Sequence, residues 1–234
     1  MTIRIRALQW ILPVFLLGCG GLQAQSGVAP IADEATVYEN QTGNNGGGDS
    51  EVCIGNLATT STRRAFVRYT LPATPAGATI ERVVLQYVQD RVRVQGAGSP
   101  KAATLVVRRV TADWVEGTGS GSGTGPCGGG SDVAGVDWAT QPTVAATNSA
   151  SAALPADDPF NVAIDTDIGS GNDGLIADVQ TWVDNGATNF GWRLAVAEEG
   201  TADNARVLVP GTLTIYWSVP VEGLIFGDGF ESSP

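Results

Sequence analysis

The sequence contains no histidine, a residue on which several common kinds of enzyme and metal site depend. Its absence excludes Ser-His-Asp hydrolysis, Cys-His proteolysis, histidine-ligated zinc and acid–base catalysis by imidazole. The glycine-rich stretch 117–130 is not a phosphate-binding loop, because no Lys-Ser or Lys-Thr pair follows it and it does not connect a strand to a helix. We therefore expect a protein that is not an enzyme and that needs no cofactor.

Long apolar segments are scarce as well, and the apolar run at 10–17 is too short to cross a membrane. Arg4 and Arg6 precede this run and small residues follow it, which is typical of a secretory signal peptide over residues 1–25. The segment 16–19 (Leu-Leu-Gly-Cys) resembles a lipobox, which would leave a lipid on Cys19 and attach the protein to a membrane. The segment 22–24 (Leu-Gln-Ala) suits an ordinary signal peptidase. Both alternatives predict an extracellular or outer-membrane-surface protein.

Cysteine is rare, with three residues in the whole chain. Because Cys19 is either removed or lipidated, Cys53 and Cys127 remain as a pair. An even pair of cysteines in an oxidising compartment usually forms a disulfide, and metal binding by the two thiols is the alternative. A bridge that closes so long a loop would stabilise the fold by about 4 kcal/mol in the chain-entropy model.

Basic side chains are outnumbered, 13 against 24 acidic ones, and the net charge of −11 argues against nucleic acid as a partner. The basic residues are also unevenly distributed. Residues 63–109 carry nine of them and only two acids, Glu81 and Asp90, whereas from Asp113 onward 17 acids accompany Arg193 and Arg206 alone. The first half of the chain therefore concentrates the positive charge.

Alternation of apolar and polar residues recurs along the chain and predicts half-buried strands. A single helical pattern interrupts it at 173–185, with Asn172 or Asp173 as a cap at its start and Gly186 at its end. We predict an all-β fold, a two-sheet jelly-roll β-sandwich with one short helix. The domain spans 35–219, between a linker at 26–34 and a tail at 220–234. The predicted strands are 64–71, 79–89, 104–110, 160–168, 190–197, 205–209 and 212–219.

Several motifs occur in a characteristic order over this domain. They include Trp-Val-Glu-Gly-Thr-Gly at 114–119, Val-Gln-Thr-Trp-Val at 179–183 and Asn-Phe-Gly-Trp-Arg-Leu at 189–194. In this order the chain resembles the DNRLRE-domain family, extracellular bacterial modules that include alginate-binding carbohydrate-binding modules. The resemblance runs from about residue 35 to residue 219. It implies a jelly-roll β-sandwich with a non-catalytic role.

Arginines within the predicted strands indicate an anionic ligand, because guanidinium groups pair bidentately with carboxylates. Arg91 and Arg93 share one strand face, and Arg68 and Arg108 would join them if all four projected from the same sheet. The alternative is that these arginines are neutralised by the C-terminal acids. Trp182 lies on the apolar stripe of the predicted helix, and Trp192 and Trp217 have the strand parity of core residues. These three rings are therefore expected in the core, which leaves other rings to stack on a sugar. The predicted ligand-binding set is Arg68, Arg91, Arg93, Arg108, Trp138 and Tyr216.

Acidic residues offer two further interpretations. Asp165, Asp167 and Asp173 lie in an oxygen-rich run that suits calcium, although the run departs from the EF-hand pattern at Ser170 and Ile176. Pairs of acids could also serve a glycosidase, namely Asp113 with Glu116, or Asp157 with Asp158. Turn formation and helix capping explain most of these acids as well.

The sequence-based hypothesis is an exported, monomeric carbohydrate-binding-like module that binds a polysaccharide or cell-surface glycan. The polymer would be anionic, and the basic strand face would hold it. The alternatives are a surface structural or adhesive protein without glycan specificity, and a polysaccharide lyase or glycosidase.

Overall fold

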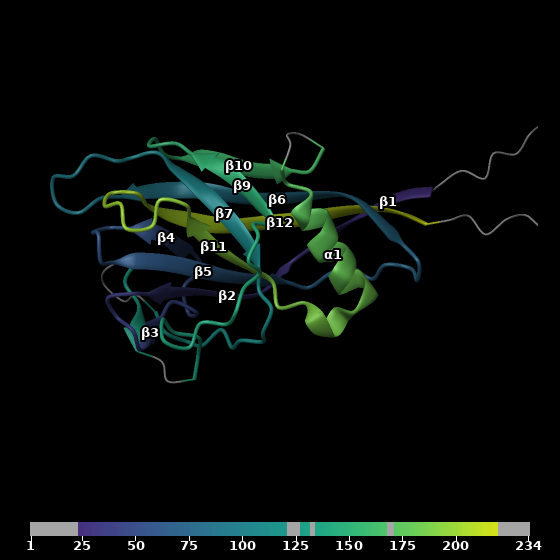
Figure 1. The fold of residues 1–234 in the computed structure, drawn as a ribbon, viewed down its shortest axis with the longest axis horizontal. Helices are drawn as coiled ribbons and strands as arrows, with labels where there is room; N and C mark the ends of the chain where they lie inside the picture. The colour runs from purple at the N-terminus through teal and green to yellow at the C-terminus, as the bar shows by residue number, and fades with distance from the viewer. Residues whose placement is uncertain (1–22, 121–126, 132–133, 168–170, 220–234) are drawn as a thin grey trace, which may run out of the picture.

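The computed structural model describes residues 23–120, 127–131, 134–167 and 171–219. Within these ranges the chain forms two antiparallel sheets and one α-helix (Figure 1). The first sheet, the β6–β12 sheet, contains β1 (Gln23–Ala29), β6 (Thr79–Arg93), β10 (Phe160–Asp165) and β12 (Ala205–Val219). The second, the β5–β11 sheet, contains β2 (Ile31–Tyr38), β3 (Asn44–Asn45), β5 (Thr62–Tyr69), β7 (Ala103–Arg109), β8 (Gly130–Ser131), β9 (Ala150–Leu154) and β11 (Trp192–Val196). The predicted all-β sandwich with one short helix is confirmed.

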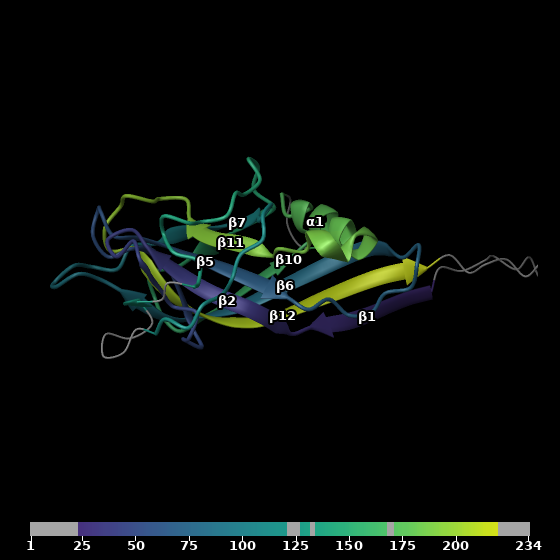
Figure 2. The same ribbon diagram turned by 90° about the horizontal axis from the view of Figure 1, so that it is seen from below.

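Strand β4 (Val52–Asn56) connects the two sheets, because it pairs with β12 on one side and with β5 on the other. The strand path therefore runs β10-β6-β12-β4-β5-β11-β7-β9 without a break. Its two end strands, β9 and β10, face each other across the one seam of a nearly closed sheet. Figure 2 shows the flattened, layered shape that results.

The core follows from the alternation of side chains along the strands. Val83, Leu85 and Tyr87 of β6 point inward and meet Ala65 and Val67 of β5. Trp182, Trp192 and Trp217 belong to the same cluster and are at most 5% exposed. This confirms the prediction that all three rings lie in the core.

The helix α1 (Gly174–Asp184) packs along β6 and buries Leu175, Val179 and Trp182 in the core (Figure 2). Its Gln180 side chain accepts the backbone N–H of Ile80 at 2.8 Å, so the helix is fixed to the start of β6. The predicted helix is therefore confirmed. Asp173 occupies the N-cap position but makes no side-chain capping bond.

The buried carboxylate of Asp178 attaches α1 to the β5–β11 sheet. It accepts hydrogen bonds from Ser149 Oγ at 2.5 Å and from Trp192 Nε1 at 2.8 Å, and Arg109 Nε lies 3.4 Å away. Burial raises the pKa of Asp178, and these donors oppose that shift. Asp178 is thus part of the framework.

Some predicted boundaries are wrong. Residues 26–34 are not a linker: most of β1 and the start of β2 lie there, and their backbone groups pair with β12 and β5. The segments 205–209 and 212–219 form one strand, β12, with a pairing irregularity between Pro210 and Leu213. Most of the predicted signal peptide, residue Cys19 and the tail 220–234 lie outside the described residues.

The predicted disulfide between Cys53 and Cys127 is confirmed, with a Cα–Cα distance of 5.3 Å. Both cysteines are buried against Val207 of β12. The bridge attaches the segment around Cys127 to β4, the strand that connects the sheets. In the part of the chain described, no helix has the length and apolar character needed to cross a membrane.

Arg206 of β12 is fully buried and joins strands on both sides of the seam. Its Nε donates to Gln89 Oε1 of β6 at 2.9 Å. Its Nη2 donates to the carbonyl of Pro155, just after β9, at 3.1 Å, and also to the carbonyl of Lys101, just before β7. The guanidinium thus links the β6–β12 sheet to the far edge of the β5–β11 sheet.

We predict that Arg206→Met lowers the free energy of unfolding by about 3 kcal/mol or more, because the carbonyl groups it serves lose their donors inside the protein. Urea denaturation followed by circular dichroism measures the loss. Arg91→Gln is the control, since Arg91 is 41% exposed and its removal should cost less than about 1 kcal/mol. Equal stability of the two variants would contradict the role assigned to Arg206.

Candidate functional site

The four arginines predicted to converge lie on different sheets. Arg68 is on β5 and Arg108 is on β7, both in the β5–β11 sheet, whereas Arg91 and Arg93 are on β6 in the other sheet. The prediction of one four-arginine face is therefore wrong. Its physical reason is the order of the strands, which places β6 three strands away from β5 along the sheet path.

Two of these arginines are neutralised within the protein. Arg68 Nε lies 3.0 Å from Asp33, its Nη2 lies 3.2 Å from Asp113, and its guanidinium packs 5.1 Å from the centre of the Trp114 ring. Arg91 pairs with Glu51 at 2.6 Å and with Asp90 at 2.5 Å. Neither side chain carries a spare positive charge, so both lose their predicted role as ligand contacts.

A different set of arginines does gather on the outer face of the β5–β11 sheet. Ala65, Val67, Leu194 and Val107 point into the core, so the residues that alternate with them point outward. Four arginines have this outward parity: Arg64 and Arg68 of β5, Arg193 of β11 and Arg108 of β7. Because Asp33 and Asp113 neutralise Arg68, we give the name arginine row to the other three, Arg64, Arg193 and Arg108.

The register of the strands makes the row compact. Arg193 lies directly opposite Arg108 on one side and opposite Phe66 on the other. Arg64 is two residues from Phe66, which makes it a diagonal neighbour of Arg193. Like charges placed directly opposite each other destabilise a sheet, so this arrangement has an energetic cost.

The row carries more positive charge than its ion pairs neutralise. Glu199 binds Arg64 through two bonds of 2.7 Å, and it is the one carboxylate that the described residues pair with the row. Arg108 donates to the neutral Asn148 side chain at 2.8 Å. The Nε of Arg193 is buried and meets no acceptor within the described part of the chain. Burial and the charges of Arg64 and Arg108 lower the pKa of Arg193 to about 10.

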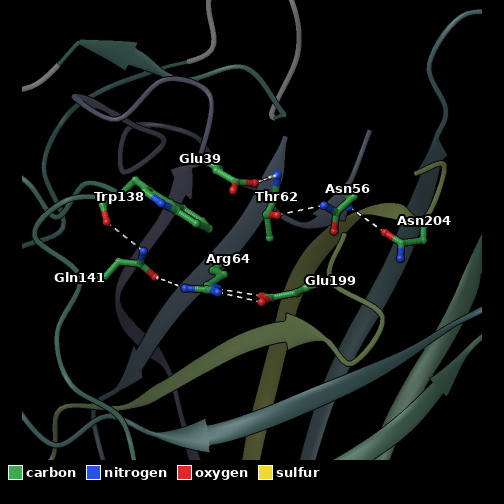
Figure 3. A network of polar contacts seen from close by, with 8 residues as sticks. All are labelled: Glu39, Asn56, Thr62, Arg64, Trp138, Gln141, Glu199 and Asn204. Carbon is green, nitrogen blue, oxygen red and sulfur yellow. Dashed lines mark hydrogen bonds and ion pairs between the residues drawn. The ribbon is translucent and has the colours of Figure 1, made fainter. Parts of the chain in front are cut away.

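Trp138 lies beside Arg64 (Figure 3), the member of the row on β5. Its ring centre is 4.6 Å from the Arg64 guanidinium, and its backbone carbonyl accepts a bond from Gln141 at 3.0 Å. Gln141 in turn accepts a bond from Arg64 at 3.2 Å. The predicted ligand residues Trp138 and Arg108 therefore occupy the same sheet face. The interactions of Arg64 with Trp138, Gln141 and Glu199 fix the position of its guanidinium.

The remaining predicted contact, Tyr216, lies on β12 in the other sheet, and the Arg82 guanidinium is 4.9 Å from the centre of its ring. Arg82 also bears on the calcium interpretation, which the described residues do not support. Arg82 pairs with both Asp165 and Asp167, and no cluster of acids suited to a metal ion occurs among the residues the structure describes. Hydrogen bonding to Arg82 lowers the pKa of Asp165, so this carboxylate is committed to an ion pair.

The acid pairs considered for a glycosidase also have structural partners. Asp113 pairs with Arg68, and Glu116 accepts the backbone N–H of Glu34 at 2.8 Å. Both acids line an open hollow of about 480 Å³ beside Trp114. Asp158 accepts the backbone N–H of Val92 at 2.9 Å, and Asp157 supplies its backbone carbonyl to Gln89 at 2.7 Å.

Among the acids of the described residues, Glu34, next to this hollow, is the one whose pKa is strongly raised. Burial, Glu116 and Asp49 raise the pKa of Glu34 to about 7, and its Oε2 atom is buried without a hydrogen-bond partner among the described residues. The folded protein therefore binds a proton at Glu34 more tightly than the unfolded chain does.

Sequence reasoning missed Arg64, Arg193 and Glu199. A signal for the first two was present, because Arg64 and Arg193 have the parity opposite to Ala65 and to Trp192 and Leu194. Two other features could not be predicted without the register of distant strands. One is that Arg193 Nε meets no acceptor among the described residues, and the other is that Arg64 pairs with Glu199, 135 positions away.

The chain matches no known family model, and no curated protein matches it either.

From the raised pKa of Glu34 we predict that stability falls as pH rises from about 4.5 to about 7, because the native state must lose a proton that it holds more tightly. Glu34→Gln should therefore unfold like the natural protein near pH 4. Above pH 7 it should be more stable by about 1–3 kcal/mol, a range that allows for partial solvent screening of this half-buried group.

Denaturant titrations at a series of pH values test this expectation. Glu39→Gln is the matched control with the opposite sign, since a hydrogen bond from Thr62 lowers the pKa of Glu39. At neutral pH Glu39→Gln should be less stable than the natural protein, and this difference should vanish in acid, where Glu39 is protonated in both the folded and the unfolded state. A Glu34→Gln variant with no gain above pH 7 would show that Glu34 has an ordinary pKa.

Proposed function

We propose that the protein is an exported, non-catalytic module that binds an anionic polysaccharide through the arginine row. The observation that carries the proposal is Arg193, which lies between Arg64 and Arg108 on the sheet and forms no ion pair with a carboxylate of the described residues. Three cations with a single acid, Glu199, form a surface that gains energy from a multiply charged partner. A linear polyuronate supplies carboxylates at regular intervals, and each can form a bidentate pair with a guanidinium.

The neighbouring side chains suit the same ligand. Trp138 is half-buried and lies beside Arg64, where the face of a sugar ring could stack beside its indole. Arg64 is held against that ring and by Glu199, so it loses little conformational freedom on binding. Export is supported by the disulfide, which persists in oxidising compartments. The resemblance of its sequence motifs to those of the DNRLRE-domain family agrees with this proposal.

A surface structural or adhesive role without glycan specificity is the second candidate. The ion pairs of Arg68, Arg82 and Arg91 favour it, because they show that most of the other strand arginines serve the fold itself. If this candidate is correct, the protein should be retained on neutral and on anionic polymers to the same extent.

The proposal predicts that Arg108→Gln/Arg193→Gln loses binding to alginate or pectin. Each lost charge-assisted contact is worth about 1.5–3 kcal/mol, so the dissociation constant should rise by about tenfold or more. Affinity electrophoresis through gels that contain the polymer measures the change at low salt. Retention of the natural protein should weaken as the salt concentration rises, because screening reduces these contacts.

Two controls separate the candidates. Arg82→Gln, which alters an arginine already paired with Asp165 and Asp167, should bind like the natural protein. A neutral glucan gel should not retain any variant. Equal retention of the double variant and the natural protein on alginate would refute the role of the row, and equal retention on the neutral gel would favour the adhesive role.

A further inference from the structure

A second group of unneutralised arginines lines a hollow at the end of the sandwich where β4 connects the two sheets. The hollow has a volume of about 270 Å³, and Arg63, Arg93, Gln41 and Cys127 are among its walls. No acidic residue lines it within the described part of the chain. It is separate from the arginine row, whose members are not among its walls.

Strand register explains why two arginines far apart in the sequence meet there. Arg93 of β6 pairs with Ala205 of β12, and Gly55 of β4 pairs with Arg63 of β5. Because β12 and β4 pair at the adjoining positions, these residues belong to one row that crosses four strands. A shift in register between β6 and β12, opposite Val207 and Leu208, precedes Arg93 and changes the face on which it projects.

Arg63 is held rigidly and has no carboxylate partner within the described residues. Its side chain is buried, with 5% of the residue exposed, and its guanidinium lies 5.8 Å from the centre of the Tyr38 ring. Its Nε donates to the Cys127 carbonyl at 2.9 Å and its Nη1 donates to the Ser61 carbonyl at 2.5 Å. Burial lowers the pKa of Arg63. Carbonyl groups accept from its guanidinium, but no carboxylate among the described residues neutralises its buried charge.

Arg93 is less buried but has even fewer partners. Its Nε atom is buried without an acceptor, and the described residues form no ion pair with its guanidinium. Arg91, two residues earlier on the same strand, differs in this respect because Glu51 and Asp90 neutralise it. Arg91 and Arg93, near the end of β6, thus provide a matched pair, one neutralised and one without an ion pair among the described residues.

We propose that this hollow is a binding site for a divalent tetrahedral oxyanion of the sulfate or phosphate type. Two guanidiniums without carboxylates match a charge of −2, and their planar N–H groups suit oxyanion geometry. The amide of Gln41 can add a neutral donor at the same wall. The volume accommodates one such group, either as a free ion or as the ester group of a larger molecule.

Isothermal titration calorimetry of the purified, disulfide-bonded protein with sodium sulfate, and separately with sodium phosphate, tests the proposal. Chloride keeps the ionic strength constant. We expect one ion to bind per chain, Arg91→Gln to bind it with unchanged affinity, and Arg93→Gln to bind it at least about tenfold more weakly, which corresponds to the loss of about 1.4 kcal/mol. Circular dichroism should show that Arg93→Gln is folded, because the described residues form no ion pair with this side chain.

The outcomes are distinct. Failure of both ions to bind the natural protein, or equal binding by Arg93→Gln, would overturn the site. A parallel titration with glucose 6-sulfate separates the two sources: binding of the ester indicates a site open to larger molecules, and binding of the free ion alone indicates a site for the inorganic ion. Arg193→Gln should bind sulfate normally, so this result does not depend on whether the arginine row binds a polysaccharide.

Discussion

The fold depends on one buried cation, the guanidinium of Arg206. Two sheets joined through β4 would be free to open at β9 and β10, where the strand path ends. Arg206 bridges this gap because it bonds at once to Gln89 on β6, to the carbonyl before β7 and to the carbonyl after β9. A lysine could not replace it, since only a planar group with five donors can serve acceptors in so many directions. The cost of burying its charge is offset by these four acceptors, including the carbonyl of Ala205.

The same accounting of partners separates framework arginines from candidate ligand contacts. Arg68, Arg82 and Arg91 each form ion pairs with two carboxylates. The sequence pattern does not distinguish them from Arg93 and Arg193, which lie on strands in the same way. Among the described residues, Arg206 bonds to neutral acceptors alone and serves the seam. The other arginines without an ion pair there lie in two places: Arg108 and Arg193 on the outer face of the β5–β11 sheet, and Arg63 and Arg93 in the hollow beside the disulfide. A protein with a net charge of −11 thus keeps two local regions of positive potential.

Local patterns were sufficient to predict much of the fold. Period-two alternation located β5, β6, β7 and β11, helical spacing located α1, and the even pair of cysteines indicated the disulfide. Strand β2 was missed because its burial does not alternate regularly: its last four residues are all buried. Burial does alternate along β1, but this strand contains a single β-branched residue, Val28, and no aromatic one, so its sequence lacks the usual strand signal. The site was less predictable. Whether an arginine is neutralised depends on acids far away in sequence, as with Arg64 and Glu199, and on a register shift in β6 that no local pattern reveals.

The pairing of β1 with β12 has a consequence for how the molecule can be connected to its surroundings. Gln23 lies opposite Val219, so the two ends of the described chain emerge side by side, beyond α1 in Figure 1. In both views β11, the strand that carries Arg193, lies on the other side of α1 from these two ends (Figures 1 and 2). An attachment made at this pole would therefore start at a distance from the arginine row.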